Sequence, residues 1–242
     1  MDKTNRMQWP WSRGDHGPLP VLLLMLSLVT GLVDSVSYLA LGHVFVANMT
    51  GNVVLLGFAF AGAPGLSVPG SLAALGAFLL GALAGGRIAT HLGEHRGRHL
   101  RAAAACAAPL LLIAFVVAAI AGQPVSDGAR YALLVPMGLA MGLQNATARR
   151  LAVPDLTTTV LTLTLTGIAA DSRLAGGPGG HPARRVLAIA AIFLGALVGA
   201  LFVVHVDLFS PLAFATVLMA STALIAHVRS SEDPGWTRPP GS

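Results

Sequence analysis

The sequence predicts an all-helical polytopic membrane protein with six transmembrane helices, two interrupted or re-entrant segments and an internal, inverted duplication. Hydrophobic residues make up 55% of the 242 residues and charged residues only 10%, whereas soluble domains carry about 25% charged residues. Mean hydropathy is +0.74, and the charges lie between long apolar runs, where they set the orientation in a membrane. The basic balance, 15 Lys and Arg against 10 Asp and Glu, is therefore no argument for nucleic-acid binding, and the lipid bilayer is the expected partner.

The chain is a succession of apolar segments separated by polar connections. A helix needs about 20 residues to cross a bilayer core, and six segments meet that length comfortably. A seventh, "TTTVLTLTLTGIAA", is short and rich in threonine, and an eighth carries the polar motif "NMTGN" in its first half. The eight segments are 19–42, 44–63, 70–90, 102–121, 129–148, 157–170, 184–205 and 208–228.

Basic residues in the connections decide between two topologies. If all eight segments cross the membrane, the basic loop 87–101 and the pair Arg149–Arg150 fall outside, against the positive-inside rule. If 44–63 and 157–170 instead dip in and return to the same side, every basic cluster becomes cytoplasmic, as do both termini. The charge pattern therefore favours six spans and two re-entrant or broken segments.

Both ends of the chain are expected to lie outside the membrane. Residues 1–17 form a cytoplasmic N-terminal segment, and the apolar run that follows is too long for the hydrophobic region of a signal peptide, so we expect a retained first span. The polar tail 229–242 is rich in Pro and Gly and is expected to be disordered. The single cysteine, Cys106, cannot form an intrachain disulfide and is expected to lie in the core.

The two halves of the chain, 18–121 and 128–228, share the same order of motifs. "LGALAG" recurs as "LGALVG", "GLVDSVSY" has a counterpart in "GLQNATAR", and each half then holds a Thr-Gly pair in an apolar run. The glycine pairs of the first motif are expected to let helices pack closely. Because three spans per half is an odd number, the second half enters the membrane inverted, a layout found in many secondary transporters. Four spans per half would make the repeats parallel and weaken this argument.

The motif "FVANMTGN" places polar residues where lipid is expected. Gly51 permits a break in the helix, and irregular backbone inside a membrane is tolerated where protein buries it or a watery cavity meets it. Asn48, Thr50 and Asn52 can satisfy the freed backbone groups or present donors and acceptors to a solute. These residues are candidates for a substrate or ion path, with backbone repair and helix packing as the alternative.

Asp34 is the one acidic residue deep in an expected span. An ionisable residue there costs about 2.5–3.5 kcal/mol on insertion scales and is a functional-site candidate by default. Tyr38 lies one turn further on and is placed to hydrogen-bond to it. Three roles are open for Asp34: proton carrier, cation ligand or structural hydrogen-bond partner.

The second half of the chain contributes further candidates. Asn145 occupies the position equivalent to the acid of the first half, and Gln144 precedes it near the cytoplasmic end of its segment. The two residues either line the inner half of a cavity or cap and snorkel at the interface. Thr166 with Gly167 is chosen from the threonine-rich segment because the pair matches the first Thr-Gly, although threonine can simply bond back to its own helix.

His91, His95 and His99 lie four residues apart beside Glu94, a spacing that resembles a metal site. Two nearby glycines weaken the helix that would align the histidines, and a solvated basic face that touches anionic lipid is the preferred interpretation. The sequence contains no phosphate loop, nucleophile elbow, paired catalytic carboxylates or zinc motif. We therefore expect no metal, no cofactor and no enzymatic activity.

These motifs together resemble a known family. "GLVDSVSYLALGHVFVANMTGN", followed by "GLQNA" and a late Thr-Gly segment, looks like the YoaK-type family of bacterial inner-membrane proteins, a domain of unknown function. The resemblance covers roughly residues 18–228 and implies a multi-pass helical fold in a bacterial cytoplasmic membrane. It brings no established substrate and no catalytic residues, so the site must be argued from the residues themselves.

Two functions are open on this basis. The first is a small-solute or ion transporter with its site between "NMTGN" and the second Thr-Gly segment, in which Asp34 senses protons or a cation. The second is a membrane scaffold or partner-binding protein, in which the polar motif serves only helix packing. The substrate, the coupling ion and the formation of a homo-oligomer are left open by the sequence.

Overall fold

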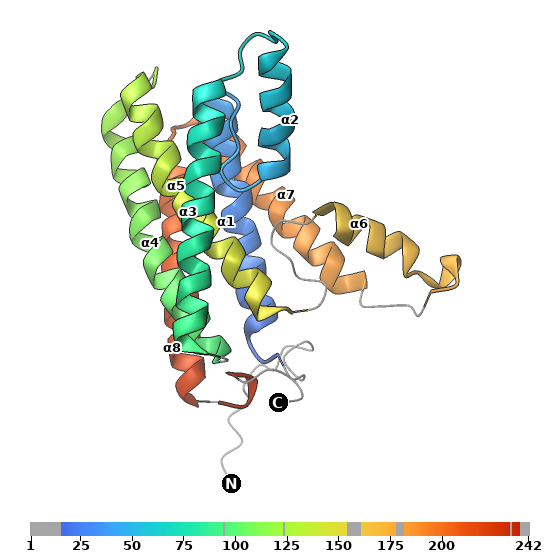
Figure 1. Cartoon of the computed structure of the whole chain (residues 1–242). Helices are drawn as coiled ribbons and strands as arrows, with labels where there is room; N and C mark the ends of the chain where they lie inside the picture. Colours follow the sequence, from blue (N-terminus) through green and yellow to red (C-terminus); the bar gives the residue numbers. More distant parts are fainter. Residues whose placement is uncertain are drawn as a thin grey trace.

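The computed structural model describes residues 16–93, 95–122, 124–153, 161–177, 182–232 and 234–237, and every regular element within them is helical (Figure 1). The expectations for 1–15, 157–160 and 238–242 lie outside the described residues. The long helices are α1 (Leu19–Ala40), α3 (Val68–Leu92), α4 (Arg96–Ala121), α5 (Asp127–Leu151), α7 (Pro182–His205) and α8 (Ser210–Glu232). The short ones are α2 (Met49–Phe60), α6 (Leu161–Ala170) and the 3₁₀ turns η1 (Arg173–Ala175) and η2 (Pro234–Thr237).

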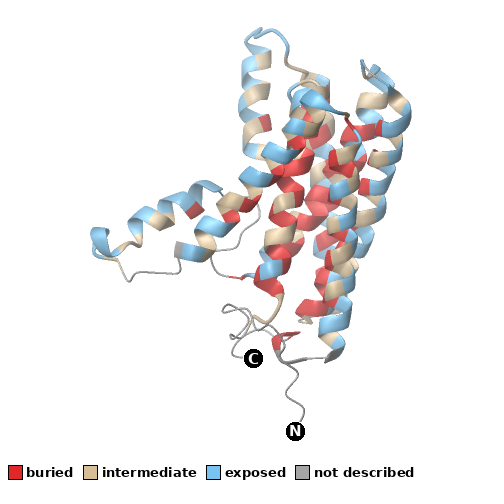
Figure 2. Ribbon diagram, turned by 180° about the vertical axis from the view of Figure 1, so that it is seen from behind, coloured by how far each residue is buried: buried red, intermediate tan, exposed pale blue. Residues whose placement is uncertain are grey.

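The long helices have the length and surface of membrane spans. Helices α1, α3, α4, α7 and α8 are long and apolar enough to cross a bilayer, and α5, with 25 residues and Pro136 in its interior, runs beside them. Buried residues lie where the helices face one another, whereas the outward faces carry exposed apolar side chains (Figure 2). Such a surface suits lipid rather than water. The chain is therefore a multi-pass helical membrane protein, as the sequence predicts.

The boundaries of α4 show why some elements exceed the apolar runs. His95 Nδ1 accepts the backbone N–H of Arg98 at 3.1 Å, which satisfies one of the free donors that begin every helix. Gly93 and Gly122 flank α4 with φ of 63° and 64°, a conformation that favours glycine. Helix α4 therefore starts ahead of the apolar run 102–121 and includes a polar first turn.

The long helices pack in a reciprocal pattern. Helix α1 runs along α7 and α5 runs along α3, while α4 lies against α8. Helix α4 also contacts α5, and α8 contacts α1. Each long helix of the first half therefore has its main neighbour in the second half, and the core forms between the two halves.

Glycines bring the backbones of two of these pairs into contact. A Cβ on Gly31 of α1 would overlap the carbonyl oxygen of Ile192 on α7, and a Cβ on Gly142 of α5 would overlap that of Phe78 on α3. Larger residues would hold these backbones apart and remove dispersion contacts between them. The close packing expected from the glycine motifs is confirmed by the return contacts, Gly195 against Leu28 and Gly81 against Leu139.

The two short helices are placed differently from the others. Helix α1 ends at Ala40, residues 41–48 run back along the bundle, and α2 then rises toward the end at which α1 finished (Figure 1). Helix α2 packs beside α3, and α6 contacts α7 and otherwise stands away from the bundle. With 12 and 10 residues, neither helix is long enough to cross a bilayer.

One end of the bundle joins the beginning of the described chain to its last elements. Arg96, which is 6% exposed at the start of α4, donates to the Leu151 carbonyl at the end of α5 at 2.6 Å. The Nη1 atom of Arg96 lies 3.2 Å from Nδ1 of His16, which comes just before α1. Gly97 lies against Ser230 at the end of α8. The start of α1 and the end of α8 therefore lie at the same end of the bundle.

Two features differ from the sequence-based expectations. The first part of the tail 229–242 is ordered, because α8 continues to Glu232 and Trp236 is buried with Nε1 donating to the Arg229 carbonyl at 3.4 Å. The expected core position of Cys106 is wrong: its side of α4 faces outward, and the thiol is exposed.

Candidate functional site

Asp34 holds the loop that precedes α2. It lies six residues before the end of α1, and its Oδ1 accepts the backbone N–H groups of Val46 at 2.9 Å and Ala47 at 2.8 Å. Backbone donors inside a membrane need such partners because no water is available to them. Of the three roles open for Asp34, the structure shows the third: the carboxylate is a structural hydrogen-bond partner of the loop.

Asn52 closes the same loop from the α2 side. Its side chain is fully buried, Oδ1 accepts the N–H of Phe45 at 2.8 Å, and Nδ2 donates to the Phe45 carbonyl at 2.5 Å. Asn48 caps α2 by accepting the N–H of Gly51 at 3.3 Å. The polar cluster in "FVANMTGN" is thus explained in large part by backbone groups that the loop would otherwise leave unpaired.

Tyr38 belongs to an aromatic cluster rather than to the carboxylate. Its ring stacks on Phe45 with centroids 4.8 Å apart and meets the His43 ring edge-on at 5.1 Å. Among the described residues, Asp34 and Tyr38 share no hydrogen bond. The phenol ring therefore packs the loop against α1, which leaves the carboxylate to the loop amides.

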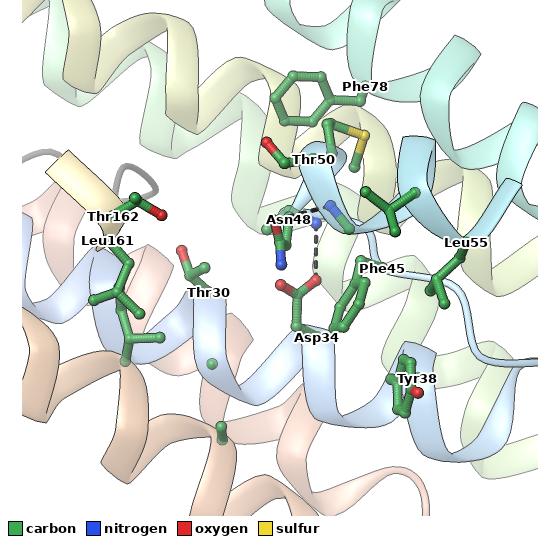
Figure 3. A pocket seen from close by; sticks show the side chains of 17 residues that line it. Thr30, Asp34, Tyr38, Phe45, Asn48, Thr50, Leu55, Phe78, Leu161 and Thr162 are labelled. Atoms are coloured by element: carbon green, nitrogen blue, oxygen red, sulfur yellow. Dashed lines mark hydrogen bonds between the residues drawn. The ribbon is translucent and has the colours of Figure 1, made fainter. Parts of the chain in front are cut away.

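A cavity of about 960 Å³ lies between this loop, α1 and the second half of the chain (Figure 3). It lies where both short helices begin, because Met49 opens α2 and Leu161 opens α6. Its described lining residues are Thr30, Gly31, Asp34, Tyr38, Phe45, Ala47, Asn48, Met49, Thr50, Gly51, Val54, Leu55, Phe78, Leu161, Thr162, Ile192 and Ala196. They come from α1, α2, α3, α6, α7 and the loop, so both halves build the walls.

The structure divides the candidate residues into two groups. Those that line the cavity are Asp34, Tyr38, Asn48, Thr50 and Gly51. Asn52, Gln144, Asn145, Thr166 and Gly167 are not among its lining residues. Thr166 is exposed on α6, and Gly167 lies against the Arg185 side chain. The repeat comparison selected the wrong threonine for this cavity, since Thr162, one turn earlier on α6, is the one that lines it.

Gln144 and Asn145 lie inside the bundle rather than at an interface. Gln144 is 3% exposed, and its Nε2 donates to the Leu26 carbonyl at 3.1 Å and to Thr30 Oγ1 at 2.9 Å. Asn145 Nδ2 donates to the Met141 carbonyl on its own helix at 2.9 Å. Gln144 therefore connects α5 with α1 directly behind Thr30, which lines the cavity.

Sequence reasoning missed several lining residues, and one of them carried a usable signal. Thr30 lies four residues before Asp34, so the two share a face of α1. A polar residue one turn from an acid inside a span is a signal that could have identified Thr30 as a candidate site residue. Phe78 and Ile192 carried no such signal. They reach the cavity through the packing of α3 and α7 across the repeat interface, which a single sequence does not show.

The charge around the cavity is simple. Asp34 is the only charged side chain among the described lining residues. The start of α2 carries partial positive charge from the helix dipole, and the carboxylate already accepts the amides leading into that helix. The cavity therefore presents one anionic group within mostly apolar walls.

The three histidines that resembled a metal site are divided between two helices. His91 lies in the last turn of α3, His95 caps α4, and His99 is buried in its first turn. Glu94, between them in sequence, lies outside the described residues. Within the residues that the structure does describe, no group of three or more His, Cys, Asp and Glu side chains is arranged to hold a metal ion.

Comparison with known proteins agrees with the fold and leaves the activity open. A family described as "Protein of unknown function (DUF1275)" matches residues 22–225. The chain belongs to the DUF1275 family. The chain is also similar to "UPF0700 transmembrane protein YoaK" of Bacillus subtilis (strain 168), with 38% identity over 156 residues, which cover 62% of this chain and 65% of that protein. The resemblance to YoaK-type proteins is thereby confirmed, and no solved structure matches the chain.

Proposed function

We propose that this DUF1275 protein moves a small solute or ion across a bacterial cytoplasmic membrane and binds it in the cavity beside Asp34. The observation that carries the proposal is the cavity itself, about 960 Å³ in volume and lined by elements of both halves, including the two short helices α2 and α6. Small-molecule sites measure roughly 300–1,000 Å³ and carry few polar groups on apolar walls. Transporter sites commonly lie at repeat interfaces near broken helices.

The glycine contacts support an inverted duplication with six spans. Gly31 follows Leu28 by three residues on α1, as Gly142 follows Leu139 on α5, and each pair faces the equivalent stretch of the partner helix. That partner is α7 for α1 and α3 for α5, so the equivalent contacts are made once in each direction. Helices α1 and α5 run in opposite senses (Figure 1), as two inverted halves require.

Basic residues support a cytoplasmic location for the end at which α1 begins and α8 ends. Arg96 is in contact with the ends of other helices there, and further arginines lie in the flanking turns. They are Arg98, Arg101, Arg149, Arg150 and Arg229. Under the positive-inside rule this end faces the cytoplasm, and α2 then enters and leaves the membrane from outside.

The scaffold alternative accounts for the Asp34 and Asn52 hydrogen bonds but not for the cavity. Helices that serve only to hold a partner gain stability by filling such a space, because an unfilled cavity forfeits packing contacts. The side chains of Thr50 and Asn48 remain exposed beside it. A binding site explains why polar groups and open space coincide.

Flux through proteoliposomes tests the proposal. The full chain is reconstituted, and the uptake of glycerol, methylammonium, 2-phenylethylammonium and formate is followed by stopped-flow light scattering. At least one solute is expected to cross faster than into protein-free vesicles, and Thr50→Trp is expected to abolish that increase by filling the cavity. Thr90→Trp, on an exposed part of α3 away from the cavity, is the matched control. Equal flux through wild type and Thr50→Trp would contradict the proposal.

A further inference from the structure

The hydrogen bonds behind the cavity fix which groups can still accept. The Leu26 carbonyl can only accept, so the nitrogen of the Gln144 amide must be the atom that faces it, at 3.1 Å. Thr30 gives its hydroxyl proton to the same carbonyl at 3.0 Å, and its oxygen accepts from Gln144 Nε2 at 2.9 Å. Every proton in this network is committed, and only acceptor capacity remains.

Gln144 Oε1 is the unused acceptor at the end of this network. The atom is buried and has no hydrogen-bond partner among the described residues. A buried carbonyl oxygen without a partner is costly, and such atoms are commonly satisfied by water or a ligand. Gln144 is 3% exposed and its Nε2 is bonded to Thr30, a lining residue, so the residue that carries the unpaired acceptor packs behind the cavity wall.

The side of this wall that faces the cavity is also made of acceptors. Thr30 and Asp34 lie one turn apart on α1 and both point into the cavity (Figure 3). The hydroxyl proton of Thr30 is committed to Leu26, and a carboxylate has no proton to give. A solute that meets this wall must therefore bring its own N–H or O–H donors.

The remaining walls suit an apolar body and a positive charge. The rings of Tyr38, Phe45 and Phe78 and the thioether of Met49 line the cavity, and aromatic faces attract ammonium groups. No Lys, Arg or His is among the described lining residues. An anion would find the carboxylate of Asp34 in front of the α2 start, where the loop amides are already bound to it.

We propose that the cavity binds a primary ammonium compound with an apolar body, its N–H groups directed at Asp34 and at the Thr30–Gln144 pair. The inference rests on the proposed function, because it takes the cavity as the site of the transported solute. Asp34 supplies the charge, Thr30 supplies an oxygen acceptor, and Gln144 positions Thr30 by donating to its hydroxyl oxygen. The aromatic rings that line the cavity, Tyr38 and Phe45 beside Asp34 and Phe78 from α3, hold the body of the solute.

Calorimetry with three matched probes tests the ammonium site. Purified full-length protein in detergent is titrated with 2-phenylethylammonium, 2-phenylethanol and 3-phenylpropionate, which share a phenyl body and differ in charge. The ammonium probe is expected to bind at least tenfold more tightly than the alcohol, with no binding of the carboxylate. Asp34→Asn is expected to weaken ammonium binding at least tenfold, and Thr30→Val roughly fivefold.

The variants are chosen so that folding does not decide the result. Asp34→Asn keeps an oxygen that can accept the Val46 and Ala47 amides, and its thermal unfolding in detergent is compared with that of wild type. Asp127→Asn removes a charge from an exposed site in the first turn of α5 and is expected to leave binding unchanged.

The binding and flux measurements test the ammonium inference and the proposed transport function separately. Failure of the ammonium probe to bind, equal binding of all three probes, or ammonium binding unaffected by Asp34→Asn would overturn the ammonium inference. The proposed transport function would still stand if another solute showed flux that Thr50→Trp blocks. It would fail only in the flux measurement, whichever probe binds.

Discussion

Replacing Gly31 with leucine is expected to destabilise the protein by about 3 kcal/mol or more, at the upper end of what overpacking costs. Even a Cβ at this position would overlap the Ile192 carbonyl, and the obstacle is backbone rather than a movable side chain. Helices α1 and α7 would have to separate along their length. The measurement is thermal unfolding of the purified protein in detergent.

Gly142→Leu and Gly86→Leu make this prediction specific. Gly142 meets the Phe78 carbonyl across the equivalent pair of helices, so its substitution is expected to cost a similar amount. Gly86 lies in α3, and a Cβ added there would have no described atom of another element within 4 Å, so leucine is expected to be neutral or slightly stabilising. Equal unfolding temperatures for Gly31→Leu and Gly86→Leu would contradict the packing described for α1 and α7.

Asn52→Ala is expected to have the second-largest effect, a loss of about 3 kcal/mol, since it leaves the backbone N–H and carbonyl of Phe45 unpaired. The fully buried amide serves both the N–H and the carbonyl of Phe45, and neither group has water to replace it in a membrane. Without this clamp, the loop before α2 loses its register against α1.

Asn48→Ala is the matched comparison because it changes the same residue type in the same motif. Asn48 is exposed and makes one long cap hydrogen bond of 3.3 Å to Gly51, so its removal is expected to cost about 1 kcal/mol. Thermal unfolding of the two variants side by side measures the difference. If Asn48→Ala proved as damaging as Asn52→Ala, the division of the motif into a buried clamp and an exposed cavity wall would be wrong.

Much of the helical architecture follows from the sequence because membrane insertion depends on local apolar length. The expected segment 70–90 corresponds to α3, and the glycine motif in it does bring α3 against α5. The difference at α4 has a local cause as well, the cap supplied by His95 ahead of the apolar run. The polar motif in the first half of 44–63 predicted an interruption, and a loop with a 12-residue helix is found there.

The site was less predictable because its walls are set by contacts between the two halves. Asp34 and Thr50 stood out as polar residues in apolar sequence, and both line the cavity. Asn52 stood out for the same reason, yet its amide bonds to the Phe45 backbone and to the Met49 thioether, within the chain itself. Polarity in a membrane segment identifies a residue with a hydrogen-bonding task, but only the packing shows whether the partner is the chain or a solute.

The measurement that tests the central claim most directly is the accessibility of position 50 from the two sides of the membrane, since it requires no knowledge of the solute. A Thr50→Cys variant is made in a Cys106→Ala background, because Cys106 is itself exposed. Right-side-out and inside-out vesicles are treated with a membrane-impermeant maleimide. Ala63→Cys, in the exposed turn after α2, serves as the one-sided control and is expected to be labelled only from outside.

A cavity that carries a solute across the membrane predicts labelling of the Thr50→Cys variant from both sides, with Ala63→Cys labelled from the outside alone. Labelling of Thr50→Cys from one side only, or from neither, would contradict the account and favour a protein that uses its polar motif to hold helices together.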